Sequence, residues 1–474
     1  MASMENGNVL HVALFPWLAM GHLIPFFHLS KCLARKGHRV SLISTPRNLQ
    51  RIPKIPSNLS SLINFICLPL PHVHNLPEQA ESSTDIPYNK QQLLKRAFDL
   101  LKLPLTNFLE SSHVDWIIYD YASHWLPSIA ADLGISRAFF SLFNAAVLAF
   151  LGPTSLFVNG GGGDLRSSAE DFTVVPPWIP FESNMAYKTY EVTKYVDSSS
   201  KNESGTSDTI RFGVTIAGSD VVFVRSSSKL EPEWFNLLDE LYQKPIIQVG
   251  FLPPELEDTF GETREKWVEI KQWLDKQRVN SVVYVALGSE ATLSQDEVNE
   301  LALGLEKSGL PFFWVLRNSP GSTHNELDKI LDGFQERVKD RGVVHVGWAP
   351  QVSILSHEAV GGFVTHCGWN SVIEGLGFGR VLILFPMIND QGLNSRLLCE
   401  KKLGVEIPRD ERDGSFTCDS VAECVRGVMV DDSFESMRAK AKQMRELFGS
   451  ISQKDCDLKR FVCYLEDNTS VSNN

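Results

Sequence analysis

The 474-residue sequence lacks the features of a nucleic-acid-binding or membrane-spanning protein. Its formal net charge is −12, and its densest basic run, Arg438–Lys442, is typical of one solvated helix face. Because phosphate backbones are bound by clustered Lys and Arg, we expect no nucleic-acid partner. No apolar stretch reaches the ~20 residues needed to span a bilayer, so no stable membrane insertion is expected.

Signals for disulfides and secretion are also missing. The eight cysteines are scattered and form no Cys-x-x-Cys pair, which favours reduced thiols in a cytosol. The apolar run Val9–Leu18 has no basic region before it and contains a proline, which is typical of a first strand rather than of a signal peptide. We therefore expect a cytoplasmic protein, and we expect it to be a monomer.

Two enzyme classes are disfavoured by the motifs that are missing. A nicotinamide-dependent dehydrogenase needs Gly-x-Gly-x-x-Gly between a first strand and its helix. The one Gly-x-Gly-x-Gly, Gly375–Gly379, comes instead at a helix end before a strand. A serine hydrolase needs a Gly-x-Ser-x-Gly elbow, which the sequence does not contain.

Short apolar runs alternate with helical patterns along the whole chain, which is typical of parallel α/β architecture. We predict strands at Val9–Phe15, Arg39–Ser44, Val114–Asp120, Arg137–Leu142, Pro245–Phe251, Ser281–Leu287, Phe312–Arg317, Val343–Gly347, Gly361–His366 and Arg380–Phe385. The predicted helices include His22–Arg35, Ser123–Leu133, Gln295–Ser308 and Asn370–Gly377, with charged amphipathic helices from Cys418 on. Two such α/β halves facing each other would form a cleft, with ligands at the carboxyl ends of the strands.

The predicted domain boundaries follow composition. A linker at 252–265 contains two prolines and a dense acidic run, and it separates domains at 1–251 and 266–450. Residues 451–474 are expected to form a helix that packs back on the first domain, followed by a tail. The Ser-rich segment Val196–Asp208 is predicted to be a mobile surface loop.

The most informative stretch is Trp348–Gln391, WAPQVSILSHEAVGGFVTHCGWNSVIEGLGFGRVLILFPMINDQ. Its polar and aromatic residues are the types that hold a uracil ring, a ribose, a diphosphate and a hexose. The stretch resembles the signature box of plant family 1 glycosyltransferases, the UDP-sugar-dependent enzymes, in length and in its first and last residues. The resemblance implies a GT-B fold of two Rossmann-like domains, with the acceptor in the first domain and the UDP-sugar in the second.

The diphosphate is expected at the helix that follows the strand Gly361–His366. A helix N-terminus presents N–H groups and a partial positive charge, which favour a phosphate. The groups predicted to face it are His366, Gly368, Asn370 and Ser371, with a second loop at Gly288 and Ser289.

The resemblance assigns further roles inside this box. It implies that Trp348 stacks on uracil, that Gln351 helps to hold the nucleoside, and that Glu374 accepts both ribose hydroxyls. The residues implied to contact the sugar are Trp369, Asp390 and Gln391, and Gly21 and Ala349 complete the predicted donor contacts. In the family a terminal Gln goes with UDP-glucose and a His with UDP-galactose, so Gln391 favours glucose.

The predicted catalytic base is His22, at the start of the helix after the first strand. An unperturbed histidine titrates near pH 6.5, so it can accept a proton from a hydroxyl in the cytosol. Asp120 ends a neighbouring strand and is predicted to stabilise the imidazolium; both positions match the family. Asp115, at the other end of that strand, is the weaker candidate.

These residues predict a single displacement in which an α-linked donor gives a β-glycoside. No metal or cofactor is expected, because the Asp455–Asp457 match to Asp-x-Asp is typical of a solvated helix face. The alternatives are another donor, such as UDP-rhamnose or UDP-galactose, or a noncatalytic nucleotide-sugar-binding protein.

Aromatic residues near the first strands are candidates for an acceptor pocket, since such walls suit flat molecules. They are Trp17, Met20, Tyr121, His124, Trp125 and Phe143. The stretches FPWLAMGHLIPFFHLSKCLARKGHRVSLISTPRN and DWIIYDYASHWLPSIAADLGIS resemble the branch that often adds a sugar to flavonoid or terpenoid glycosides. The expected acceptor is a flavonoid, terpenoid or steroid hydroxyl, on an aglycone or on a glycoside.

Overall fold

The computed structural model describes residues 9–158, 166, 168–192, 204–255, 264–288, 290, 293–317, 333–449 and 451–469. Ser289, residues 256–263 of the predicted linker and residues 196–203 of the Ser-rich segment lie outside these ranges. The chain divides into two compact units. The first unit contains Met1–Ser167, Asp197–Leu252 and Ile451–Asn474, and the second contains Ser168–Val196 and Pro253–Ser450. The predicted ranges 1–251 and 266–450 therefore missed that residues 168–196 belong with the second unit.

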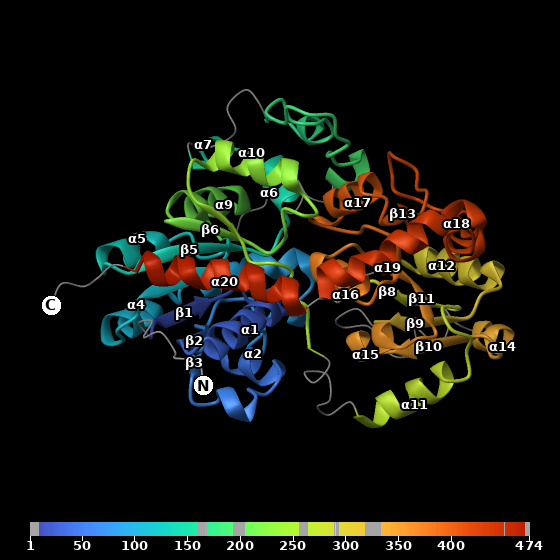
Figure 1. Cartoon of the computed structure of the whole chain (residues 1–474), viewed down its shortest axis with the longest axis horizontal. Coiled ribbons are helices and arrows are strands. Elements are labelled where there is room, and N and C mark those ends of the chain that lie inside the picture. The colour runs from blue at the N-terminus through green and yellow to red at the C-terminus, as the bar shows by residue number, and fades with distance from the viewer. Residues whose placement is uncertain are drawn as a thin grey trace. The chain divides into compact units, whose positions relative to one another are not determined.

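A seven-stranded parallel sheet forms the centre of the first unit (Figure 1). Its order is β3 (Ile63–Cys67), β2 (Arg39–Ser44), β1 (His11–Phe15), β4 (Trp116–Tyr119), β5 (Ser136–Ser141), β6 (Val221–Val224) and β7 (Ile246–Gln248). The order reverses between β1 and β4, where Phe15 lies opposite Tyr119. Ligands bind at such a switch point in doubly wound folds, outside the carboxyl ends of the strands.

The second unit repeats this plan with six parallel strands. Their order is β10 (Gly342–Val346), β9 (Phe312–Leu316), β8 (Val282–Ala286), β11 (Val360–Thr365), β12 (Val381–Leu384) and β13 (Gly404–Glu406). The switch point lies between β8 and β11, where Ala286 is opposite Thr365. The α/β class with two Rossmann-like domains is confirmed.

Helices connect the strands in both units (Figure 1). Those of the first unit are α1 (Met20–Arg35), α2 (Pro46–Arg51), α3 (Gln91–Asp99), α4 (Lys102–Ser111), α5 (Leu126–Asp132), α6 (Ala145–Leu151), α7 (Ser155–Val158), α9 (Asp208–Ala217), α10 (Pro232–Tyr242) and α20 (Ile451–Asp467). Those of the second are α11 (Arg264–Leu274), α12 (Gln295–Ser308), α14 (Phe334–Val338), α15 (Gln351–Ser356), α16 (Trp369–Gly377), α17 (Gln391–Glu400), α18 (Cys418–Val430) and α19 (Glu435–Gly449). None of the described helices is both long and apolar enough to cross a bilayer.

Local signals explain why some elements match their predicted limits. The predicted helix Gln295–Ser308 has the bounds of α12, because Ser294 and Glu297 form a capping box at its start. Gly309, with φ of 69°, ends it in the left-handed conformation. By contrast, two strands were not predicted: β3, an outer strand in which only Ile63 is buried, and the three-residue β13.

The C-terminal helix α20 completes the core of the first unit. Its residues Leu458, Phe461 and Leu465 are buried in the same cluster as β1, β4 and β6. The Phe461 ring packs edge-on against Phe223 of β6, with centroids 4.6 Å apart. The indole Nε1 of Trp116 donates a hydrogen bond to the Leu465 carbonyl at 3.1 Å. The end of the chain thus supports the sheet that carries the β1–β4 switch point.

Candidate functional site

The switch point of the first unit brings His22 and Asp120 together. His22 lies in the first turn of α1, and Asp120 directly follows β4. Nδ1 of His22 lies 2.7 Å from Oδ2 of Asp120. Since a carboxylate can only accept, this contact assigns the proton to Nδ1 and the lone pair to Nε2. The pair therefore has the geometry of an oriented base and its supporting acid.

Backbone groups hold the Asp120 carboxylate in place. The backbone N–H groups of Trp17 and Ala122 donate to Oδ2 and Oδ1, at 2.7 and 3.2 Å. The residue is only 2% exposed, so these bonds offset the cost of burying its charge. Asp115 has a different role, because its Oδ2 accepts the N–H of His11 at the opposite edge of the sheet.

An aromatic cluster begins next to the His22 side chain. The Tyr121 ring lies 5.8 Å from the His22 ring and 6.3 Å from Trp17. Tyr121 also stacks on Phe212 of α9 at 4.7 Å, and Phe212 lies 5.5 Å from Phe143. The predicted acceptor residues Tyr121 and Phe143 are thus joined through Phe212, which was not singled out from the sequence.

The other predicted acceptor-side residues have different surroundings. Trp125 is buried, and its Nε1 donates to Asp99 at 3.2 Å. Nδ1 of His124 lies 3.2 Å from Nη1 of Arg211. Met20 packs partly against the core, and Gly21 is exposed at the start of α1. Trp125 and His124 therefore make contacts within the protein, with Asp99 and Arg211 respectively.

In the second unit, a tyrosine orients the polar residues predicted to hold the nucleoside. The Tyr284 hydroxyl donates to Oε1 of Gln351 at 3.3 Å, and burial raises the pKa of Tyr284, so the hydroxyl keeps its proton. Nε2 of Gln351 then donates to Glu374 Oε2 at 2.7 Å and to Ser371 Oγ at 3.1 Å. The amide orientation is thereby set, and Glu374 is held as an acceptor.

His366 occupies a narrow space after β11. A Cβ atom built on Gly288 would lie 2.7 Å from His366 Nε2, and one built on Gly368 would lie 2.4 Å from it. Burial, and next the charge of Arg317, lower the pKa of His366 to about 4. The ring is therefore neutral at pH 7, and its Nδ1 has no hydrogen-bond partner among the described residues. It can offer one N–H to an anion but not a positive charge.

The turn after His366 is tightly constrained. Cys367 is buried with φ of 67°, which is unusual for a residue other than glycine. Gly368 then forms the N-cap of α16 without a side-chain hydrogen bond, and no acidic residue follows in the first turn. An uncapped start of this kind favours an anion. Asn370 and Ser371 lie in this first turn, and Trp369 is 4% exposed.

Two of the three residues predicted to contact the sugar, Asp390 and Gln391, lie at the start of α17. Oε1 of Gln391 accepts the backbone N–H groups of Met387 and Ile388, both at 3.0 Å. This leaves the NH2 group as the donor that Gln391 can offer to a ligand. Nδ2 of Asn394 donates to Asp390 Oδ2 at 2.7 Å and to the Cys367 carbonyl at 2.9 Å. Asn394 thus links the predicted sugar contacts to the turn after His366.

Residues 183–192 pack on the outside of α17 and form part of the second unit. The Glu191 carboxylate accepts from Nη2 of Arg396 at 2.8 and 2.9 Å and lies directly against Gly392. Lys188 pairs with Glu406 of β13 at 2.8 Å. These contacts, which the sequence analysis did not anticipate, support the helix that begins with Gln391.

Trp348 follows β10 and is suited to stacking. Its side chain is 46% exposed, which is unusual for so large an apolar group. Nε2 of His345 lies 3.0 Å from its carbonyl oxygen, and the next residue, Ala349, is buried. An exposed indole held by its backbone can receive a flat ring such as uracil.

The chain is similar to known plant glycosyltransferases along its whole length. The family model described as "UDP-glucoronosyl and UDP-glucosyl transferase" matches residues 262–441. UDP-glycosyltransferase 91C1 of Arabidopsis thaliana is 60% identical, and the match covers 99% of each chain. Soyasaponin III rhamnosyltransferase of Glycine max is 39% identical over 98% of this chain and 96% of its own.

Solved structures show the same fold. The crystal structure of Glycyrrhiza uralensis UGT73P12 complexed with glycyrrhetinic acid 3-O-monoglucuronide has a TM-score of 0.79 and 23% sequence identity. The match covers 97% of this chain and 96% of that one. The expected GT-B fold class is confirmed.

We predict that Gly368→Ala weakens UDP binding, because the new methyl group would displace His366 and the turn that precedes α16. Overpacking costs about 1–3 kcal/mol. If this cost is lost from the free energy of UDP binding, the dissociation constant of UDP rises roughly 5–150-fold. Titration calorimetry with UDP measures this change.

Gly377→Ala is the matched control, since it lies in the same helix and its added Cβ would meet no atom within 4 Å. Equal UDP affinity of the two variants would show that the turn does not face the nucleotide.

Proposed function

Because the chain belongs to the UDP-glycosyltransferase family, we propose that it is an inverting O-glucosyltransferase that uses UDP-glucose. The proposed acceptor is a hydroxyl of a plant specialised metabolite, and the product is a β-glucoside. The observation that carries this proposal is the 2.7 Å contact between His22 Nδ1 and the buried Asp120 carboxylate. It creates an oriented base at the switch point of the first sheet.

In the proposed reaction, Nε2 of His22 takes the proton of the acceptor hydroxyl. The oxygen forms a bond to the anomeric carbon while the bond from that carbon to the UDP oxygen breaks. The electron pair of the broken bond leaves with UDP, and the configuration at carbon inverts. Asp120 stabilises the imidazolium that results, because its carboxylate accepts a hydrogen bond from Nδ1 at 2.7 Å.

The second unit is proposed to bind UDP-glucose. Trp348 stacks on uracil, and Gln351 and Glu374 hold the nucleoside, with the carboxylate accepting the ribose hydroxyls. The start of α16, with His366, Asn370 and Ser371, stabilises the charge that develops on the diphosphate, a task we assign to these donors and not to a metal. The uncapped Gly368 and the neutral, half-buried His366 ring support this assignment.

Glucose is the proposed sugar because the resemblance to the family implies it, through the terminal Gln of the box, here Gln391. Its NH2 group and the neighbouring Asp390 carboxylate offer a donor and an acceptor to adjacent hexose hydroxyls. UDP-rhamnose is the second candidate donor, since the 39% identical soybean relative is a rhamnosyltransferase.

The proposed acceptor is flat and apolar at one end, because Tyr121, Trp17 and Phe143 form an aromatic wall near His22. A flavonoid or a terpenoid or steroid hydroxyl fits this description, and a glycoside is favoured over a bare aglycone by the resemblance to the chain-extending branch. Rates with each glycoside and its aglycone, measured side by side, test this preference.

We predict that His22→Ala abolishes transfer to an acceptor, whereas UDP binding persists because the nucleotide is held by the second unit. Asp120→Asn should lower kcat by about 10²–10⁴-fold, as loss of the supporting carboxylate does in comparable sites. Product formation is followed by liquid chromatography and UDP binding by calorimetry.

Asp115→Asn serves as the control, since the Asp115 side chain accepts the His11 N–H at the opposite edge of the sheet from Asp120. Full activity of His22→Ala, or equal losses in the two Asp variants, would contradict the proposed base.

We also predict that Gln391→Glu raises KM for UDP-glucose by about tenfold, because a carboxylate keeps the two backbone bonds but cannot donate to the sugar. The loss of one hydrogen bond of about 1–2 kcal/mol has this size.

The affinity for UDP, which has no hexose, should stay unchanged in the same variant and serves as its internal control. An unaltered KM for UDP-glucose would remove Gln391 from the sugar site.

A further inference from the structure

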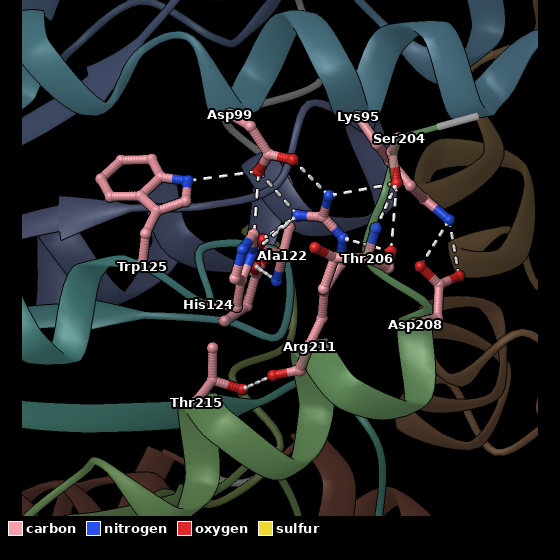
Figure 2. Close-up of polar contacts among 11 residues, drawn as sticks. Lys95, Asp99, Ala122, His124, Trp125, Ser204, Thr206, Asp208, Arg211 and Thr215 are labelled. Atoms are coloured by element: carbon pink, nitrogen blue, oxygen red, sulfur yellow. Dashed lines mark hydrogen bonds and ion pairs between the residues drawn. The ribbon is translucent and has the colours of Figure 1, made fainter. Parts of the chain in front are cut away.

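A buried arginine lies behind the segment that carries Asp120. We call residues 120–125, between β4 and α5, the Asp120 loop. Arg211 of α9 is 0% exposed, and its guanidinium points at this loop (Figure 2). A buried guanidinium is costly unless all its donors are used, so its partners reveal what it holds in place.

Arg211 is paired with Asp99 at the end of α3. Nη1 donates to Asp99 Oδ1 at 2.8 Å, and Nη2 pairs with Oδ2, so the contact is bidentate. Nε donates to the Thr206 carbonyl at 3.3 Å, and Nη2 reaches the Ser204 hydroxyl at 3.4 Å. The end of the Ser-rich segment, predicted to be a mobile loop, is thus bound to the core at residues 204–208.

The remaining contacts of this pair go to the Asp120 loop. Nη1 of Arg211 donates to the Ala122 carbonyl at 2.6 Å, and Nδ1 of His124 lies 3.2 Å from the same nitrogen. Burial, and next the charge of Arg211, lower the pKa of His124, so this ring is neutral and can accept. Asp99 Oδ1 also accepts Trp125 Nε1 at 3.2 Å. Three loop residues are therefore held by one ion pair (Figure 2).

A continuous path of hydrogen bonds leads from this ion pair to the proposed base. Arg211 holds the Ala122 carbonyl, and the N–H of Ala122 donates to Oδ1 of Asp120. The other oxygen of Asp120 accepts from His22. The residue next to Arg211, Phe212, stacks on Tyr121 in the same loop. Two consecutive residues of α9 thus contact the Asp120 loop: Arg211 bonds the Ala122 carbonyl, and Phe212 stacks on Tyr121.

A role limited to joining α9 to α3 would not need these loop contacts. Lys95 of α3 and Asp208 of α9 already join the two helices, through contacts of 2.5 and 2.6 Å (Figure 2). Neither of their charged groups contacts the Asp120 loop in the described contacts. This second ion pair provides a matched comparison within the same two helices.

We propose that Arg211, with Asp99, is a positioning residue for catalysis that holds Asp120 in line with His22 through the Ala122 peptide. The proposal rests on the function proposed above. Its chemical basis is that an error of about 1 Å in a catalytic contact can reduce the rate by about 10²-fold.

The test compares Arg211→Lys, Asp99→Asn and Lys95→Met in the full-length protein, with UDP-glucose and an accepted glycoside. A lysine keeps the charge, but one ammonium group cannot reach Asp99, Ala122 and Thr206 together. We expect Arg211→Lys and Asp99→Asn to lower kcat by roughly 10–100-fold with the dissociation constant of UDP unchanged. Lys95→Met should lower the melting temperature to a similar extent and leave kcat within about twofold of the wild-type value.

A double-mutant cycle separates positioning from general stability. In the Asp120→Asn background, Arg211→Lys should cause no further loss of kcat, because its effect passes through Asp120. An additive loss, or a wild-type kcat in Arg211→Lys and Asp99→Asn, would overturn the proposal. If Asp120→Asn alone kept full activity, the assignment of Asp120 would fail instead, so the two failures are distinguishable.

Discussion

The buried carboxylate of Asp120 is the group on which the arrangement of the first unit depends. It accepts hydrogen bonds from the Trp17 N–H, from the Ala122 N–H and from Nδ1 of His22. An ion at 2% exposure would be strongly unfavourable without such partners. The same bonds join the segment after β1, the first turn of α1 and the end of β4, so one charge determines where the proposed base lies.

In the second unit, the proposed binding site for the charged donor includes a neutral imidazole and two oriented amides. His366 is neutral because desolvation, and next the charge of Arg317, lower its pKa, and the amides of Gln351 and Gln391 are each oriented by intramolecular bonds. In both glutamines the carbonyl oxygen is occupied within the protein. The NH2 group of Gln391 remains the donor it can present, whereas that of Gln351 fixes Glu374 and Ser371. Preformed dipoles of this kind stabilise developing charge without rearranging during the reaction.

The sequence allowed the parallel α/β halves to be predicted, because strands buried on both faces have continuous apolar runs, as in VVYVA of β8. It also allowed His22 and Asp120 to be paired, because both follow strands that end at the same edge of a sheet. The Trp348–Gln391 residues were identified by resemblance to a family, and the structure adds how they are oriented.

Pairings between distant segments could not be predicted. Arg211 and Asp99 are 112 positions apart, and Glu191 and Arg396 are 205 apart, so no local pattern links them. For the same reason residues 168–196 were placed in the wrong unit, and the last residues of the Ser-rich segment were expected to be mobile. For Trp125 and His124 the acceptor contacts stay predictions, and the structure adds contacts within the protein that residue type alone did not indicate.

The central claim is a single displacement at the anomeric carbon, with His22 as the base. The most direct measurement is the anomeric configuration of the glycoside formed from UDP-α-glucose, determined by proton NMR of the purified product. The account predicts a β-linked glucoside, recognised by the large coupling between the axial protons on C1 and C2. An α-linked product would contradict it, because retention of configuration cannot arise from one direct displacement.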